Sequence, residues 1–186
     1  MDLDDVVPAP EHVTRQSRAI AAPTAVVWEE LQRVTLSSLP ISALLIAARF
    51  LPSLLTRRTG ASPLARRFVD VVPVPLLSSE PPSVLVYGGL LQPWRASGGA
   101  GSSSLDAAGL RHWNEPGWVK AAMEFRLTPD GEGTTLRTET RVSATDRASS
   151  LVFSGYWVFV GPGSSTIRRE LLAVVSHRAE ARAVSS

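Results

Sequence analysis

The side chains of this sequence that could most readily hold a metal or move a proton are three histidines, His12, His112 and His177. They lie far apart along the chain, and no pair has the spacing of a zinc-ligand motif. The chain also has no cysteine, which excludes disulfides, thiol chemistry and cysteine-ligated metals. We therefore expect no metal site and no cofactor, and surface or structural roles for the histidines.

Catalytic motifs are equally absent from the sequence, which has neither a Gly-x-Ser-x-Gly nucleophile elbow nor a Walker loop. The carboxylates Glu124 and Glu139 are interpreted as surface ion-pair partners rather than an acid/base couple. We assign no catalytic residue.

Gly161-Pro162-Gly163-Ser164-Ser165 has two interpretations. Glycines before a helix start, followed by Arg168 and Arg169, could bind an anion through free backbone N–H groups. Alternatively, Pro162 breaks or kinks the last helix, because it lacks one helical hydrogen bond and clashes with the preceding turn. We favour the kink.

Aromatic residues are few, but tryptophan is frequent among them, with five in 186 residues. Core packing is the default interpretation for each large ring. Trp94 and Trp113 flank a Gly/Ser-rich segment, residues 95–106, whose composition predicts a flexible loop. We expect these two tryptophans at the mouth of a cavity.

The elements that must position these side chains include one clear hairpin. Alternation predicts a strand over 119–128, a turn over 129–133 and a strand over 136–144. The outer face of this hairpin carries mixed charges. Its inner face would hold Met123, Phe125, Thr138 and Thr140.

The other predicted elements come from capping, proline and periodicity signals. They are a strand over 12–21, helices over 23–34 and 40–55, strands over 68–72 and 84–91, a helix over 106–113, and a last helix from 147 to 183, interrupted at 161–163. Residues 1–10 are expected to be a loose tail before one domain, 11–186.

Composition indicates a globular protein, with 44% hydrophobic and 19% charged residues. The net charge is +2, and the arginines are interleaved with acids, which argues against a nucleic-acid partner. The apolar run 39–55 is too short for a membrane span and is interrupted by Arg49. We expect no integral membrane segment and a cytoplasmic location, because the acidic N-terminus lacks signal-peptide features.

Two stretches carry a resemblance to a known family. Residues 20–28, Ile-Ala-Ala-Pro-Thr-Ala-Val-Val-Trp, are similar to the opening strand-to-helix turn of the START-like superfamily. The ending, with Thr138-Glu139-Thr140-Arg141-Val142, Asp146, Tyr156-Trp157 and Gly161-Pro162-Gly163-Ser164, resembles an uncharacterised bacterial branch of that group. The superfamily includes polyketide cyclase/dehydrase and lipid-transport proteins (SRPBCC).

This resemblance implies an α+β helix-grip fold, in which a curved antiparallel sheet wraps around a long C-terminal helix and leaves an apolar cavity. Two short helices would follow the first strand. The residues that we predict to line the cavity are Trp94, Trp113, Met123, Phe125, Thr138, Thr140, Phe153, Tyr156 and Trp157. Inward threonines suit a cavity better than a solid core, because buried hydroxyls need partners.

Three functions fit this expectation. The first is a non-catalytic carrier or sensor of a small hydrophobic molecule. The second is an enzyme of the cyclase/dehydratase kind, with Tyr156, Thr138, Thr140 or His112 positioning the substrate. The third is an interaction or regulatory module without a ligand. The absence of a clear inward Asp, Glu or Lys favours the first over the second.

Overall fold

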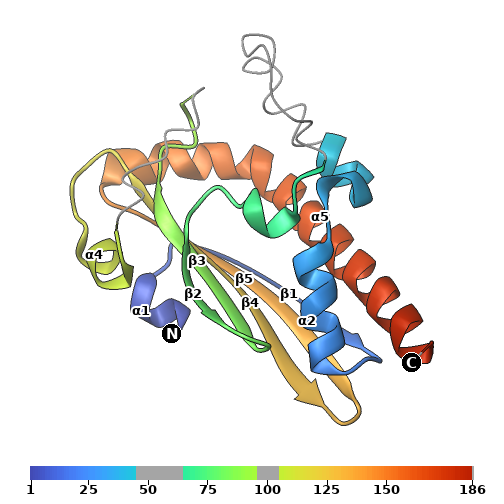
Figure 1. Cartoon of the computed structure of the whole chain (residues 1–186). Helices are drawn as coiled ribbons and strands as arrows, with labels where there is room; N and C mark the ends of the chain where they lie inside the picture. Colours follow the sequence, from blue (N-terminus) through green and yellow to red (C-terminus); the bar gives the residue numbers. More distant parts are fainter. Residues whose placement is uncertain (45–64, 96–104, 186) are drawn as a thin grey trace. The chain divides into compact units, whose positions relative to one another are not determined.

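The computed structural model describes residues 1–44, 65–95 and 105–185. Its elements, in chain order, are α1 (Leu3–Val6), β1 (His12–Ile20), α2 (Thr24–Arg33), η1 (Leu36–Ser38), η3 (Phe68–Asp70), β2 (Leu76–Glu80), β3 (Val84–Leu91), α4 (Ala107–His112), β4 (Val119–Asp130), β5 (Gly133–Ala144) and α5 (Arg147–Val184). They are labelled in Figure 1.

The five strands form one curved antiparallel sheet in the order β1-β5-β4-β3-β2. β3 and β4 pair without a break from Val84↔Arg126 to Leu91↔Val119. β4 and β5 form the predicted hairpin, and its turn places Gly131 at φ 59°, a left-handed conformation that suits glycine. With its short helices and a 38-residue C-terminal helix, the chain has the predicted α+β helix-grip architecture.

The chain divides into two compact units. Unit 1 comprises Met1–Arg15, Pro73–Arg126 and Arg137–Pro162, and unit 2 comprises Gln16–Val72, Leu127–Leu136 and Gly163–Ser186. β1, β4, β5 and α5 contribute residues to both. The two units are described one at a time below.

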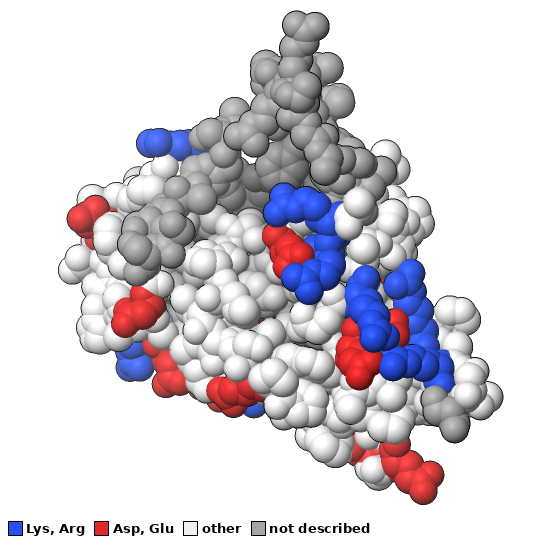
Figure 2. Space-filling view, in the orientation of Figure 1, with Lys and Arg blue, Asp and Glu red and all other residues white. Residues whose placement is uncertain are grey.

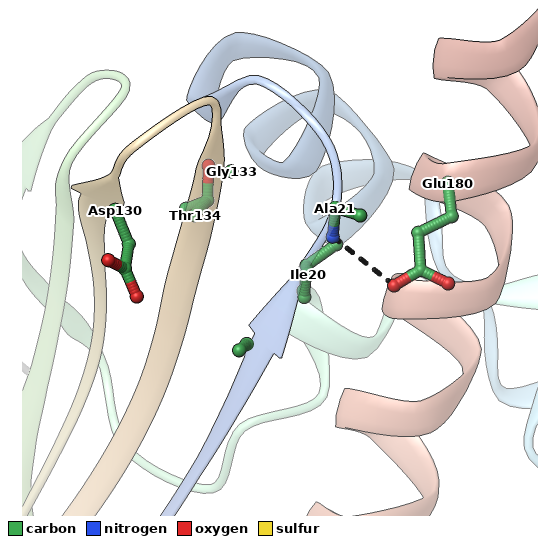
Figure 3. A pocket seen from close by; sticks show the side chains of 7 residues that line it. Ile20, Ala21, Asp130, Gly133, Thr134 and Glu180 are labelled. Carbon is green, nitrogen blue, oxygen red and sulfur yellow. Dashed lines mark hydrogen bonds between the residues drawn. The ribbon is translucent and has the colours of Figure 1, made fainter.

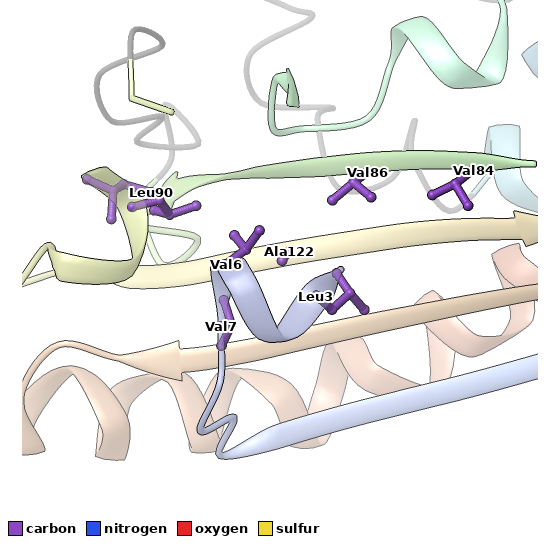
Figure 4. Close-up of a cluster of buried hydrophobic side chains, with 8 residues drawn as sticks. Leu3, Val6, Val7, Val84, Val86, Leu90 and Ala122 are labelled. Atoms are coloured by element: carbon purple, nitrogen blue, oxygen red, sulfur yellow. The ribbon is translucent and has the colours of Figure 1, made fainter. Parts of the chain in front are cut away.

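In unit 1, one face of the β3–β4 pair is covered by α1 and α4 (Figure 4). The buried cluster there consists of Leu3, Val6, Val7, Val84, Val86, Leu90, Leu110 and Ala122. α4 begins as predicted, because the Asp106 side chain accepts a hydrogen bond from Gly109 N at 2.7 Å. β3 is therefore buried on both of its faces along most of its length.

Gly88 makes the close approach of the two helices to β3 geometrically feasible. A Cβ atom at this position would lie 2.6 Å from Leu77 Cδ1 and 3.1 Å from both Leu110 Cδ2 and Val6 Cγ1. Any larger side chain at position 88 would push these groups away from the strand.

Residues 1–10 differ from the loose tail that we expected. Leu3, Val6 and Val7 are almost completely buried, and the i, i+3, i+4 spacing brings all three to the sheet. The acidic residues between them hid this apolar face in the sequence. α1 is thus an integral part of the core of unit 1.

The long helix α5 starts in unit 1 at a set of short hydrogen bonds to one carboxylate. The Asp146 carboxylate accepts hydrogen bonds from Gly117 N at 2.6 Å, Ser149 Oγ at 2.6 Å and Ser149 N at 3.0 Å. The backbone hydrogen bond from Gly117 and those from Ser149 hold the pKa of this carboxyl well below its ordinary value. Asp146 therefore caps the start of α5 and links it to Gly117, just before β4.

Helix α5 lies against β1 within each unit. In unit 1, the His12 ring meets the Phe153 ring at a centroid distance of 5.2 Å. In unit 2, Gln16 Nε2 donates to Ser165 O at 3.1 Å and Ala21 N donates to Glu180 Oε1 at 3.3 Å.

In unit 2, α2 buries Val27 and Leu31. The strand predicted over 68–72 is wrong: η3 forms instead, because Asp70 accepts two hydrogen bonds from the Arg67 side chain and its N–H bonds to Arg67 O, which favours a turn. Of the helix predicted over 40–55, residues 40–44 are helical and the remainder lies outside the described residues. In unit 1, β2 was missed, because its residues read as irregular.

Charged side chains of both signs lie beside one another on the face shown in Figure 2. In unit 2, for example, Arg182 Nη1 lies 2.8 Å from Glu29 Oε2 and 3.2 Å from Glu30 Oε1. This interleaving on the face shown matches the mixture of arginines and acids along the sequence.

A leucine pair in unit 1 tests the packing of α1. Leu3→Ala should lower the free energy of unfolding by about 2–5 kcal/mol, because it opens a hole in a buried cluster. Leu151→Ala, at a position 68% exposed, should change it by less than about 0.5 kcal/mol. Urea denaturation measures both, and equal small effects would show that α1 does not pack on the sheet.

Candidate functional site

The predicted cavity residues of the hairpin share one side of the sheet in unit 1. Ala122 belongs to the cluster under α1, and Glu139 bonds to Arg141, which forms an ion pair with Asp4 of α1. Met123 and Phe125 on β4, and Thr138 and Thr140 on β5, alternate with these residues and so lie on the opposite side. We call this side the inner face.

The middle of the inner face is buried. Phe125 and Thr138 are both 0% exposed, and the Tyr87 ring meets the Phe125 ring edge-on at 6.3 Å. Thr138 Oγ1 has no hydrogen-bond partner among the described residues. A buried hydroxyl without a hydrogen-bond partner costs about 1–3 kcal/mol of stability. Its presence on the inner face indicates a position where a polar group of a ligand could form the missing hydrogen bond.

On the helix side, α5 brings together three of the predicted residues. The Phe153 ring stacks on Trp157 at 5.4 Å and tilts against Tyr156 at 5.9 Å. Phe153 is buried, whereas Tyr156 and Trp157 are half-buried. They form a continuous aromatic surface over one turn of α5.

His12 joins this aromatic surface, and the sequence interpretation did not anticipate it. Its ring lies 5.2 Å from Phe153 and 6.0 Å from Trp157, and its Nε2 is 3.2 Å from Ser154 Oγ. The half-buried positions of β1 in unit 1 are His12 and Thr14, with exposed Val13 and Arg15 between them. His12 thus lies on the same side of β1 as Thr14, and the residue types His-Val-Thr-Arg show no apolar–polar alternation that would have predicted this.

Trp113 does not lie at the mouth of an inner-face cavity, so that prediction is wrong. It packs against the cluster under α1 and α4, on the opposite side of the sheet, because it directly follows α4 and Leu110 buries α4 there. Trp94 is half-buried just after β3, and its contact with a ligand stays a prediction.

The other two histidines lie on the surface. His112 is exposed and its Nδ1 is 2.8 Å from Ala108 O of its own helix, and His177 is also exposed. Within residues 1–44, 65–95 and 105–185, no group of three or more His, Asp or Glu side chains could hold a metal ion.

The interruption predicted at Gly161-Pro162-Gly163 is wrong, because α5 runs through these residues as one helix. The kink that we favoured at Pro162 stays a prediction. Gly161 instead gives the Trp157 ring room: a Cβ there would lie 3.2 Å from Trp157 Nε1. Without a helix start at this point, the anion-binding interpretation loses its backbone N–H groups.

Arg168, expected on the surface, is 5% exposed, and its burial lowers its pKa to about 10.

On the side opposite the inner face, the predicted ion pairs are present but their carboxylates are buried. Glu124 is 5% exposed and binds Arg126, with Oε2–Nη2 at 2.6 Å. Glu139 is 2% exposed and receives hydrogen bonds from Arg15, Arg141 and Arg137. Burial by itself would raise the pKa of Glu139, but these three hydrogen bonds outweigh it and lower the pKa to about 2.

A shallow pocket of about 380 Å³ lies in unit 2 and contains none of the predicted cavity residues (Figure 3). Its lining is Ala19, Ile20, Ala21, Asp130, Gly133, Thr134 and Glu180. Both carboxylates already accept hydrogen bonds, Asp130 from Thr135 and Glu180 from Ala21 and Ser176. The apolar part of this lining is limited to Ile20 and two alanines, and Thr134 Oγ1 already donates to Ala22 O at 2.8 Å, so we place the candidate site on the inner face of unit 1.

No helix within the described part of the chain is both long and apolar enough to cross a membrane.

Comparison with known proteins yields no family model and no curated protein that matches the chain. Solved structures that match include protein MLL2253 from Mesorhizobium loti (17% identity, TM-score 0.41, covering 89% of this chain and 98% of that one). TTHA0849 from Thermus thermophilus matches at 14% identity and a TM-score of 0.34, over 94% of this chain and all (100%) of that one. CalU16 from Micromonospora echinospora matches at 17% identity and a TM-score of 0.26, over 94% and 87%.

The Glu139 cluster predicts how stability depends on pH. The pKa of this carboxyl is lower in the folded chain than its ordinary value of 4.5, so its contribution is present above pH 4.5 and is lost as the pH falls towards about 2. Glu139→Gln should lower the free energy of unfolding at pH 7 by roughly 1–3 kcal/mol.

Urea denaturation of both proteins between pH 7 and pH 2 measures this difference. It should shrink through the window from 4.5 to about 2. A difference that stays constant across this window would mean that the charge of Glu139 contributes nothing.

Proposed function

We propose that the inner face of unit 1 binds a small hydrophobic molecule, between the hairpin and the first half of α5, in a carrier or sensor role. The observation that carries this proposal is the fully buried Thr138 hydroxyl without a hydrogen-bond partner among the described residues. A folded core of apolar contacts gains nothing from such a group, whereas a binding site uses isolated polar groups to orient its ligand.

The aromatic surface of α5 supplies the complementary apolar wall. Phe153 and Trp157 present stacked rings, and an apolar or aromatic molecule placed on such rings is stabilised by buried area and by ring–ring contact. His12 and Ser154 add one polar pair to this wall. The described residues of unit 1 thus offer apolar surface with sparse, oriented hydrogen-bonding groups.

An enzyme of the cyclase/dehydratase kind is the second candidate, and one observation favours it. His12 is a titratable side chain within 3.2 Å of Ser154 Oγ and beside the aromatic surface, so it could accept or donate a proton there. His112, considered for this role from the sequence, is bonded on its own exposed helix. Turnover of a bound ligand, abolished in His12→Gln with binding retained, would favour the enzyme over the carrier.

A tryptophan–valine pair on α5 tests binding. Trp157→Ala should weaken the affinity for the apolar dye 8-anilinonaphthalene-1-sulfonate by roughly tenfold, because one wall of the site is removed. Val158→Ala, one residue further on and 70% exposed, should leave the affinity unchanged. Dye fluorescence titration measures both, and circular dichroism verifies folding.

Equal dye affinity in the Trp157→Ala, Val158→Ala and unmodified proteins would place the site elsewhere. Failure of the unmodified protein to bind any apolar probe would contradict ligand binding and favour an interaction module.

We expect Thr138→Val to make the fold more stable and the binding of a hydroxyl-bearing ligand weaker. Removing an unpartnered buried hydroxyl should raise the free energy of unfolding by about 1 kcal/mol. The same change should weaken binding of 2-naphthol, whose hydroxyl can pair with Thr138, and leave binding of 2-methylnaphthalene unchanged. Calorimetry with this probe pair is the measurement. Loss of stability together with unchanged 2-naphthol affinity would show that the hydroxyl is a structural group.

A further inference from the structure

A second binding feature lies on the opposite side of the sheet in unit 1, where two arginines of neighbouring strands converge on one carboxylate oxygen. Arg15 Nε of β1 donates to Glu139 Oε2 at 2.8 Å, and Arg137 Nη2 of β5 donates to the same oxygen. Arg15 Nη2 also donates to Oε1 at 3.1 Å. We call these two residues the guanidinium pair.

The charges around the guanidinium pair do not balance. Arg141, the third arginine on Glu139, is 13% exposed and also binds Asp4, so its charge has its own counter-ion. Glu139 alone then serves Arg15 and Arg137. Two positive charges that share one negative charge repel each other, and a further anion beside them would relieve this repulsion.

The geometry leaves the guanidinium pair accessible to such an anion. The side chains of Arg15 and Arg137 are 56% and 46% exposed, whereas the carboxylate that holds them is 3% exposed. Within the described residues, no hydrogen bond engages Nη1 of Arg15, nor Nε and Nη1 of Arg137. Buried Glu139 therefore fixes the two guanidinium groups and leaves their outer N–H donors directed away from it.

We infer that the guanidinium pair binds a phosphate group, carried by a soluble phosphoester or by a lipid headgroup. A phosphate offers several acceptor oxygens and up to two negative charges, which matches two planar groups with outward N–H donors. Glu139 has the role of a positioning residue, since it holds both arginines without reaching the ligand itself. This site is separate from the inner face, because Glu139 and the inner-face threonines alternate along β5.

The test uses the full chain at low ionic strength, since exposed charges are screened by salt. The soluble probe is phenyl phosphate, titrated by calorimetry, and the membrane probe is phosphatidylcholine vesicles with and without phosphatidic acid, tested by co-sedimentation. Arg15→Gln and Arg137→Gln should each weaken phenyl phosphate binding by roughly tenfold or more, as expected for loss of a charged hydrogen bond. Arg33→Gln, which removes an arginine 57% exposed and ion-paired in unit 2, should leave the affinity unchanged.

The two measurements distinguish a soluble phosphoester from a lipid headgroup. Binding of phenyl phosphate without retention on phosphatidic-acid vesicles supports a soluble ligand, and retention that Arg15→Gln abolishes supports a lipid headgroup. Equal weakening in Arg33→Gln would reduce the effect to net charge and overturn the inference, as would no binding of either probe. Arg15→Lys keeps a charge beside Glu139 while losing the planar fork, so it should still weaken binding even where Arg15→Gln fails to fold.

Discussion

The register between β3 and β4 is the constraint on which the rest of unit 1 depends. Eight consecutive residue pairs join the two strands, and both faces of the pair are used. One face holds the cluster under α1 and α4, and the other holds Phe125 and Tyr87 of the inner face. A slip by one residue would exchange every side chain between these faces, placing Glu124 where Phe125 now lies. The eight-pair ladder therefore positions the core and the candidate site at once.

Local signals predicted much of this fold. The hairpin of β4 and β5 follows from alternation, the start of α4 from the capping residue Asp106, and strand β3 from a continuous run of mostly apolar residues. All three signals act over a few residues. What the sequence could not reveal depends on partners distant along the chain. α1 is helical because Leu3 and Val6 find β3 and β4, more than 70 residues away. Trp113 likewise packs against the cluster under α1 and α4, opposite the inner face, because its partners there are distant along the chain.

The sequence predicted on which side of the sheet each residue of the candidate site lies, but it did not predict which charged side chains are buried. Alternation correctly separates Thr138 from Glu139, since neighbours on a strand face opposite ways. It also suggested that charged residues mark a solvated face. That inference failed for Glu139, because three arginines can satisfy a carboxylate that is removed from water. Burial of a charge depends on its partners, and an alternation pattern does not report them.

Gly88 has a consequence for how this sheet can change over generations. Because one added carbon at position 88 would meet Leu77, Leu110 and Val6, a substitution there is acceptable only after those neighbours have become smaller. The three belong to β2, α4 and α1, so a single position couples the mutational histories of three elements. We expect descendants of this chain to vary at these four positions together or to keep all four. The order of changes matters as well, with the neighbours shrinking before position 88 grows.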